Sequence, residues 1–271
     1  MKMDLEILEN KARKLRRDIL KVVASAKSSH VGSMLSIIEI LTYLFYEKME
    51  FNRSNYKNKD RDKFILSKGH ASLALYSILA DKDIIDKSQL ETYCKNGGKL
   101  IGHLDHSVEG VEISTGSLGH GLPIATGIAL ANKLDKLNNK TYCLIGDGEC
   151  NEGSIWESFI FIANNDLKNL VVFIDANKLQ GYDFCDKILP ENRLINLLKS
   201  LDLNFYEIDG HNFSDLQKTF EKISSSDNNK ASIILAHTTK GKGVSFMENK
   251  LEWHYKSPNV EELKNALEEL R

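Results

Sequence analysis

The chain has 271 residues, a formal net charge of −2 and 42% hydrophobic residues, which is enough to bury one sizeable core. Charges of both signs are mixed along it, with no basic arm and no acidic tail, so the composition argues against nucleic acid or a strongly basic protein as a partner. The longest apolar runs, such as residues 170–174 and 233–236, are too short to cross a membrane, and the charged N-terminus does not resemble a signal peptide.

The first third of the chain is expected to be mainly helical. Apolar residues recur at helical spacing from residue 4 to residue 26, and the stretch from residue 34 to residue 47 is apolar enough to be buried on more than one side. The elements expected here are helices over residues 4–26, 34–47 and 71–80 and a short buried strand over residues 64–66.

Beyond a glycine-rich turn at residues 116–121, strand and helix patterns alternate. The expected strands are residues 141–145, 170–175, 203–208 and 232–237. The expected helices are residues 122–134, 153–164, 191–200, 213–224 and a polar closing helix over residues 260–270. Strands that alternate with helices imply parallel βαβ units, so the expected fold class is α/β, with a doubly wound, mostly parallel sheet flanked by helices. We expect one domain over residues 1–271.

The cysteines are scattered and include no CxxC pair; they are Cys94, Cys143, Cys150 and Cys185. This pattern favours free thiols in a reducing cytoplasm over a disulfide framework or a zinc site. Cys150 lies beside a segment rich in candidate site residues, but a filler residue in a loop is favoured there over a reactive thiol.

The most informative segment is the end of the strand expected at residues 141–145. It delivers Asp147 between Gly146 and Gly148, just before a helix, and the next strand is followed by Asn177. If the two strands are neighbours, these polar side chains emerge together at the carboxyl edge of the sheet, where ligands bind in this fold. A carboxylate and an amide oxygen suit Mg²⁺ or Ca²⁺, and glycines let the backbone approach a diphosphate. Alone, the Gly-Asp-Gly triplet is equally a common tight turn.

The Gly-Asp-Gly triplet followed one strand later by asparagine resembles the thiamine-diphosphate signature, in the version found in transketolases. Four further blocks resemble that family in the same order along the chain. The five blocks are residues 29–33, residues 67–72, residues 102–103 with 110–121, residues 146–153, and residues 239–248 with 253–254. The resemblance identifies the chain as similar to the N-terminal, thiamine-diphosphate-binding subunit of a split transketolase.

The resemblance implies a role for each matching residue. Asp147, Asn177 and the backbone carbonyl of Leu179 would hold Mg²⁺ (or Ca²⁺). The cofactor-binding residues would be His70, Gly116, Ser117, Leu118, Gly146, Gly148, Glu149, Asn177 and His254. The catalytic residues would be His30, His70 and His103, which face the substrate channel, and Glu152, which couples two active sites across a subunit interface.

The other histidines, His106, His120, His211 and His237, are expected to be surface or satisfied core residues. Tyr255 follows His254 where the family usually has glycine, which predicts a more restricted backbone at that contact. The Lys240–Gly243 segment does not have the spacing of a P-loop, and the resemblance implies a mobile loop near the cofactor.

The family's glutamate that contacts the pyrimidine ring, and its arginines that grip substrate phosphate, belong to a second domain. No second α/β domain is evident within the 271 residues, so we expect a separate C-terminal subunit that carries the pyrimidine-binding domain, in an α2β2 assembly. The implied activity is transfer of a two-carbon ketol unit from a ketose to an aldose, both small-molecule sugars.

Four alternatives stay open at the level of the sequence. The chain is compatible with the alpha subunit of a 2-oxo-acid dehydrogenase, although that family lacks several of the five blocks. Deoxyxylulose-phosphate synthase is a second neighbour, but it is normally one long chain. A transketolase-like enzyme for a modified or nucleotide-linked sugar is the third. A non-catalytic regulatory paralogue is the fourth, and the presence of Asp147, Asn177 and the channel histidines argues against it.

Overall fold

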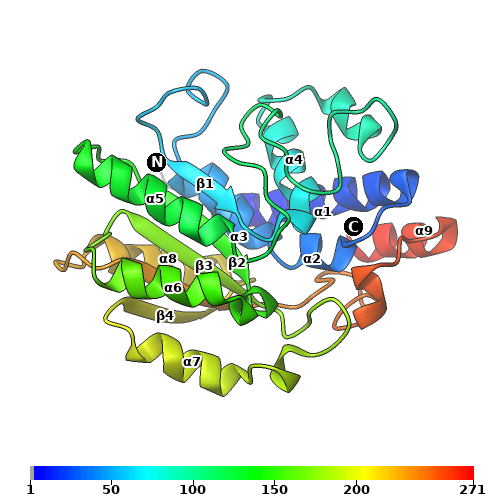
Figure 1. Ribbon diagram of the computed structural model, residues 1–271. Helices are drawn as coiled ribbons and strands as arrows, with labels where there is room; N and C mark the ends of the chain where they lie inside the picture. The colour runs from blue at the N-terminus through cyan, green and yellow to red at the C-terminus, as the bar shows by residue number, and fades with distance from the viewer. Residues whose placement is uncertain (1–2) are drawn as a thin grey trace.

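The structure, a computed structural model, describes residues 3–271 and is built on one five-stranded sheet. The strands are β1 (Lys63–Leu66), β2 (Thr141–Gly146), β3 (Leu170–Ala176), β4 (Asn204–Asp209) and β5 (Ser232–His237). They lie in the order β1-β2-β3-β5-β4, and all four neighbouring pairs are parallel (Figure 1). The predicted α/β class with a parallel sheet is confirmed.

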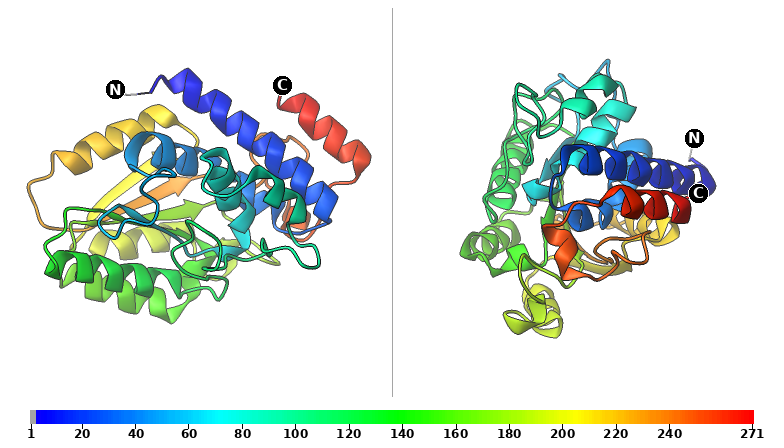
Figure 2. Two further views of the ribbon diagram at one scale, coloured as in Figure 1. Left: turned by 90° about the horizontal axis from the view of Figure 1, so that it is seen from above. Right: turned by 90° about the vertical axis from the view of Figure 1, so that its right-hand side faces the viewer.

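Helices cover both faces of this sheet. The α-helices are α1 (Leu5–Ala26), α2 (Val31–Leu35), α3 (Ile38–Tyr43), α4 (Ser72–Asp81), α5 (Gly121–Leu134), α6 (Gly153–Ala163), α7 (Glu191–Ser200), α8 (Phe213–Ser224) and α9 (Val260–Glu269). Shorter turns of other helix types are Leu44–Lys48, Gly69–Ala71, Lys87–Thr92, Gly148–Asn151, Cys185–Lys187 and Leu251–His254. Helices α5, α6 and α7 lie on one face, and α1, α3 and α8 lie on the other (Figures 1 and 2).

The two faces follow from the alternation of side chains along each strand. On β1, Ile65 packs into the core shared with α5, α6 and α7, whereas Phe64 and Leu66 pack into the core shared with α1, α3 and α8. Strands β2, β3 and β5 alternate in the same way, which is the pattern of a sheet that is buried on both sides. Each fully buried aliphatic side chain contributes about 1.5–3 kcal/mol, so these two cores stabilise the sheet edge that carries the site.

Both terminal helices are defined by local capping. The Asp4 side chain accepts a hydrogen bond from the Glu6 backbone nitrogen at the start of α1, and Lys27 ends the helix in a left-handed conformation with φ of 50°. In α9, Asn259 and Glu262 form a reciprocal capping box. The two helices lie side by side (Figure 2), and the C-terminal end of α9 packs against the middle of α1, where Arg17 donates to the carbonyl oxygens of Leu267 and Leu270.

The single helix expected over residues 34–47 is wrong. The chain instead forms α2, then α3, then one π-helical turn at Leu44–Lys48. The break lies at Ile37, whose φ and ψ of −109° and 6° depart from helical values. Next to the break, the Ser36 hydroxyl donates a hydrogen bond to the buried Asp175 carboxylate, 2.8 Å away. The need to satisfy that charge is a tertiary constraint that apolar periodicity does not report.

The strand register brings chemically distinct residues to one edge. Gly146 of β2 pairs with Asp175 of β3, and Ala176 of β3 pairs with His237 of β5. The residues that leave the sheet next therefore emerge side by side at its carboxyl edge, as expected for ligand sites in parallel sheets.

In residues 3–271, no helix combines the length and the apolar character that crossing a membrane requires.

Candidate functional site

A cavity of about 370 Å³ opens at the carboxyl edge of the sheet. It lies where β2 and β3 end, and the loops that follow Gly116, Leu179 and Lys240 contribute to its wall. Of the residues that the sequence analysis assigned to metal, cofactor or catalysis, all but Ser117 line it. Ser117 is exposed within the same glycine-rich turn. The structure therefore brings together residues that span more than 220 positions of the chain.

Asp147 supplies the one carboxylate of the expected metal site. It is buried, and its two oxygens accept hydrogen bonds from the backbone nitrogens of Gly148 (2.8 Å) and Lys178 (2.6 Å). Within residues 3–271, no basic side chain forms an ion pair with it. Burial, and next the nearby charge of Asp175, raise the pKa of Asp147 to about 6. A buried carboxylate without a counter-charge suits a bound cation.

Asn177 and Leu179 supply two neutral oxygens beside Asp147. The Asn177 side-chain nitrogen donates to Asp175 at 2.8 Å, so the amide oxygen faces the other way and accepts from the Leu179 backbone nitrogen at 3.1 Å. The Leu179 carbonyl oxygen lies 3.2 Å from the Lys240 ammonium, which shows that it already faces a positive charge. One carboxylate, one amide oxygen and one carbonyl oxygen form a donor set that fits Mg²⁺ or Ca²⁺ once phosphate and water complete the shell.

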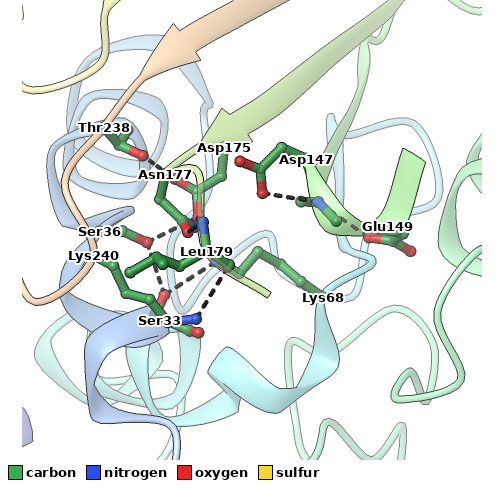
Figure 3. A network of polar contacts seen from close by, with 12 residues as sticks. Ser33, Ser36, Lys68, Asp147, Glu149, Asp175, Asn177, Leu179, Thr238 and Lys240 are labelled. Carbon is green, nitrogen blue, oxygen red and sulfur yellow. Dashed lines mark hydrogen bonds and ion pairs between the residues drawn. The ribbon is translucent and has the colours of Figure 1, made fainter. Parts of the chain in front are cut away.

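A buried ion pair behind these ligands was missed in the sequence analysis. Asp175 is fully buried, and its carboxylate lies 2.5 Å from the Lys68 ammonium. It also accepts hydrogen bonds from Ser36, Asn177 and Thr238 (Figure 3). Burial would raise the pKa of Asp175, but the Lys68 ammonium and the hydrogen bonds from Thr238 and Asn177 lower it. A charged residue inside the otherwise apolar strand 170–175 was the signal in the sequence, although nothing there identified its partner.

Two lysines place positive charge in the cavity, and the sequence analysis gave neither side chain a binding role. Lys68 lies in one of the family blocks, and its ammonium also donates to the Ser33 carbonyl oxygen at 3.2 Å. Lys240 is 1% exposed, and its ammonium lies 2.8 Å from His254 Nδ1. Burial, and next the charge of Lys68, lower the pKa of Lys240 to about 8. Two buried lysines that line the cavity favour an anionic ligand there.

The two glycines of the Gly-Asp-Gly triplet have different surroundings. A Cβ atom on Gly148 would lie 2.9 Å from Gln180 Cβ, so only glycine permits this approach of two loops. A Cβ atom on Gly146 would meet no atom within 4 Å, so Gly146 borders open space in the cavity. That space is where a diphosphate could approach the backbone.

Glu149 lines the cavity, but its carboxylate is hydrogen-bonded to other groups of the same chain. Its carboxylate accepts hydrogen bonds from the Ser67 hydroxyl and from the backbone nitrogens of Gly119 (2.8 Å) and Gly146 (3.2 Å). Glu149 therefore ties the glycine-rich turn at residues 116–121 to the end of β2. Burial raises the pKa of this carboxyl group.

A cluster of four histidines lies in the cavity wall, and Lys240 links it to the Leu179 carbonyl oxygen through His254. The His30 ring lies at centroid distances of 5.2 Å from His70, 5.8 Å from His103 and 5.0 Å from His254. His30 has a φ of 71°, a conformation that few residues other than glycine, asparagine and aspartate adopt. Its backbone nitrogen donates to the His254 carbonyl oxygen at 2.8 Å, which holds this unfavourable conformation.

Most of this cluster is held uncharged. Burial, and next the neighbouring His103, lower the pKa of His30 to about 4. Burial, and next the Lys240 charge, lower the pKa of His254 to about 3, and burial with the Lys68 charge lowers the pKa of His70. At neutral pH these three rings each offer one N–H donor and one acceptor, which suits contacts with sugar hydroxyls and proton transfer.

The depressed pKa of His30 makes stability depend on pH. Between pH 6.5 and about 4 the unfolded chain binds a proton at this residue and the folded chain does not, so stability present above pH 6.5 is lost as the pH falls. We expect the cofactor-free chain to lose more unfolding free energy between pH 7 and pH 5 than its His30→Asn variant does. Asparagine does not titrate and tolerates the left-handed backbone. Urea unfolding at both pH values measures this; equal losses would contradict it.

The segment that carries His103 packs closely against the glycine-rich turn at residues 116–121. A Cβ atom on Gly116 would lie 2.8 Å from the His103 ring, and Gly116 has a φ of 156°. An antiparallel bridge joins Leu104 to Thr115, and the Thr115 hydroxyl donates to the Leu66 carbonyl oxygen at 2.7 Å. The exposed His103 is thus held at the cavity mouth by the end of β1.

Tyr255 follows His254 at the position where the family usually has glycine, and its backbone is not strained. Its φ and ψ are −115° and −19°, so no glycine is needed at this position. Its ring centroid lies 4.7 Å from that of His254. A Cβ atom on Gly181 would lie 3.0 Å from the Tyr255 hydroxyl, so the absent side chain of Gly181 makes room for the tyrosine across the cavity.

The remaining expectations concern residues at or near the cavity rim. Glu152 is exposed and lies against Gly119, whose added Cβ would be 2.7 Å from that of Glu152. His106 and His120 are exposed, and neither lines the cavity.

Cys150 is fully buried, and burial raises the pKa of its thiol, which fits a filler residue and not a reactive one. Among residues 3–271 there is no group of three or more His, Cys, Asp or Glu side chains that could hold a metal.

Comparison with known proteins defines the class. A family model described as "Transketolase, thiamine diphosphate binding domain" matches residues 7–270. The chain is 37% identical over 268 residues to one of the subunits of the apulose-4-phosphate transketolase of Phocaeicola vulgatus, covering 99% of this chain and 95% of that one. It is also 37% identical over 264 residues to a 6-deoxy-6-sulfo-D-fructose transketolase subunit of a Clostridium species, covering 97% and 96%.

The solved transketolase of Campylobacter jejuni has the same fold, with a TM-score of 0.93 and 30% identity over 99% of this chain. The match covers 43% of that longer chain. The fold and the cavity thus define a thiamine-diphosphate-binding domain. The chain belongs to the transketolase family, and its nearly end-to-end match to two such subunits identifies it as an N-terminal subunit of a split transketolase. The predicted family, fold and enzyme class, a transferase, are confirmed.

Proposed function

We propose that the cavity holds thiamine diphosphate through a divalent cation bound by Asp147, Asn177 and the Leu179 carbonyl oxygen. The observation that carries this proposal is the buried Asp147 carboxylate, which has no ion-pair partner in the described part of the chain and lines the same cavity as Asn177 and Leu179. The cationic side chains of Lys68 and Lys240 and the open space at Gly146 support a diphosphate next to that cation. Mg²⁺ is favoured over Ca²⁺ because only a few protein oxygens are present and phosphate would complete the shell.

We propose that the assembled enzyme transfers a two-carbon ketol unit from a ketose donor to an aldose acceptor. The cofactor, when bound, serves as the electron sink for cleavage of the carbon–carbon bond. The neutral His30 and the exposed His103 would bind the hydroxyl groups of the sugar at the cavity mouth. His30 or His70 would move protons within hydrogen-bond reach of those hydroxyls.

A separate subunit would complete the site. Residues 3–271 contain one five-stranded sheet and so a single α/β domain, and the proposed partner carries the pyrimidine-binding domain in an α2β2 assembly. Glu152 is exposed and immediately precedes α6. Helices α5 and α6 also expose large apolar side chains: Ile124 of α5 (41%) and Ile160 (59%) and Phe161 (44%) of α6. Exposed apolar side chains next to Glu152, which has no ion-pair partner among residues 3–271, support burial of the α5–α6 surface in that assembly. The four free cysteines support a cytoplasmic location.

The substrate class is proposed to be a specialised sugar. The two matching subunits described above are named for apulose-4-phosphate and for 6-deoxy-6-sulfo-D-fructose, and both match this chain nearly end to end. Tyr255 across from Gly181 narrows the same mouth at which the sugar would enter. Modified ketoses are therefore the first donors to screen, ahead of the pentose phosphates.

Calorimetric titration with thiamine diphosphate and Mg²⁺ tests the proposal. The chain is titrated alone and together with the separate pyrimidine-domain subunit. Binding that becomes tight only with the partner would support a shared site, and light scattering of the mixture would report the α2β2 mass. Absence of binding in the mixture would contradict the proposed enzyme function and favour a regulatory paralogue. Turnover with pyruvate and a dye acceptor would instead indicate a 2-oxo-acid dehydrogenase.

Replacement of His103 by alanine is expected to separate substrate binding from cofactor binding. His103 packs on Gly116 at the cavity mouth and is not one of the proposed ligands of the cation. We expect kcat/KM for the ketose donor to fall by about tenfold, the effect of losing one hydrogen bond to a sugar hydroxyl, worth about 1.5 kcal/mol. The Kd for thiamine diphosphate should change less than about threefold, because one exposed contact is worth little there. Parallel losses in both quantities would contradict the assignment.

A further inference from the structure

His211, in the turn between β4 and α8, uses both nitrogens of its ring. Nδ1 lies 2.9 Å from Glu39 Oε2, and Nε2 lies 2.8 Å from the backbone nitrogen of Thr239. The side chain is only 12% exposed. The ring therefore bridges α3 to the segment that follows β5, which is the segment that carries Lys240.

The charge on Glu39 decides which ring nitrogen carries the proton. Arg16 forms a two-pronged ion pair with Glu39, at 2.5 and 2.6 Å, and both side chains are buried. Burial would raise the pKa of Glu39, but Arg16 and the His211 hydrogen bond lower it to about 2. The carboxylate is thus ionised and only accepts hydrogen bonds. Nδ1 must donate to it, which leaves Nε2 as the acceptor for the Thr239 N–H group.

Thr239 stands between two side chains that enter the polar network of the cavity. The Thr238 hydroxyl donates to Asp175, and the Lys240 ammonium contacts the Leu179 carbonyl oxygen (Figure 3). The same ammonium also lies 2.8 Å from His254 Nδ1. The Thr239 backbone nitrogen is thus the anchor between these two contacts. A displaced peptide at residue 239 would misplace both side chains, because they flank it directly in the chain.

We propose that His211 is a positioning residue for the cofactor site, since its Nε2 anchors the Thr238–Lys240 segment and so aims the Lys240 ammonium at the Leu179 carbonyl and the bound diphosphate. The inference rests on the proposed binding of thiamine diphosphate. It assigns a distinct role to a histidine that does not line the cavity. The competing explanation is that His211 only satisfies the buried charge of Glu39.

Two amide variants separate these explanations. His211→Gln keeps an acceptor near the position of Nε2 but gives up the donor to Glu39, and His211→Asn keeps the donor near Nδ1 but gives up the acceptor for Thr239. We expect His211→Gln, with its partner subunit present, to bind thiamine diphosphate and Mg²⁺ within about threefold of the wild type. His211→Asn should bind about tenfold more weakly, the effect of misplacing one charge-assisted contact. Calorimetry gives both values.

A second measurement needs no cofactor. Hydrogen exchange of the Thr239 amide in the chain alone should be slow in the wild type and in His211→Gln, and fast in His211→Asn. His237→Asn serves as the matched control, because the His237 ring contacts Glu207 and Glu191 and not Thr239. It should change neither readout.

The reverse order would overturn the inference. If His211→Asn binds the cofactor like the wild type and keeps the Thr239 amide protected while His211→Gln fails, the Glu39 contact is the important one. Failure of the wild-type complex to bind thiamine diphosphate would instead contradict the proposed function, and the exchange of the Thr239 amide would still decide the role of His211.

Discussion

Replacing Asp147 with alanine is expected to abolish measurable binding of thiamine diphosphate and Mg²⁺ by the assembled enzyme. Asp147 is the only carboxylate in the proposed donor set, and Asn177 and Leu179 contribute neutral oxygens. Changes in residues that merely orient metal ligands cost about 10–100-fold in affinity, so loss of the only charged ligand should cost at least about 100-fold. Calorimetric titration at constant Mg²⁺ measures the change.

Asp202→Ala is the matched control for this variant. Asp202 has a 78% exposed side chain paired with Lys230, at the amino edge of the sheet and away from the cavity. Circular dichroism spectra of both variants establish that each is folded. If Asp147→Ala bound the cofactor within a few-fold of the wild type, the cation would not be held at the ends of β2 and β3.

Breaking the buried pair between Lys68 and Asp175 is expected to give the largest loss of stability of any single substitution near the site. Lys68→Met leaves the Asp175 carboxylate buried without its counter-charge. Asp175→Asn likewise leaves the Lys68 ammonium buried without a counter-charge. Removing one partner of a buried pair costs about 3–5 kcal/mol because the remaining charge is uncompensated. Urea unfolding of the chain gives the free energy of unfolding for each variant.

The double variant distinguishes a true pair from two separate effects. Lys68→Met combined with Asp175→Asn removes both charges, so its loss should be smaller than the sum of the single losses by about 1–3 kcal/mol. Lys187→Met, which breaks the exposed pair with Asp183 in the 179–187 loop, should leave the unfolding midpoint nearly unchanged. Strict additivity of the Lys68 and Asp175 variants would mean that the two charges do not stabilise each other.

The two predictions describe complementary parts of one site. Asp147 faces the cavity without a counter-charge, whereas Asp175, two residues before Asn177, is fully neutralised within the protein. Adjacent strands thus end in one carboxylate left for a ligand and one that orients the Asn177 amide. The same contrast explains why the pKa of Asp147 is raised while that of Asp175 is lowered.

The order of strands and helices was predictable from the sequence because each element is specified locally. Helices α7 and α8 and strand β5 have the predicted bounds, since apolar periodicity and nearby glycine or polar residues mark their ends. The glycine-rich turn was equally visible, and Gly116 and Gly119 do adopt positive φ values. The metal, cofactor and histidine residues came from resemblance to a family, and spacing alone left the Gly-Asp-Gly triplet open to a plain turn.

Only the tertiary structure decided how the polar groups are satisfied. Lys68 meets Asp175 from 107 positions away, and His211 meets Glu39 from 172 positions away. The same need for buried partners interrupts the helix expected over residues 34–47 next to Ser36. Hydrophobic periodicity reports which face of an element is buried, but a buried charge is stable only beside a partner that folding brings to it. The sequence therefore determined the elements and the ligand-bearing edge, and the packing of distant segments determined the charges behind it.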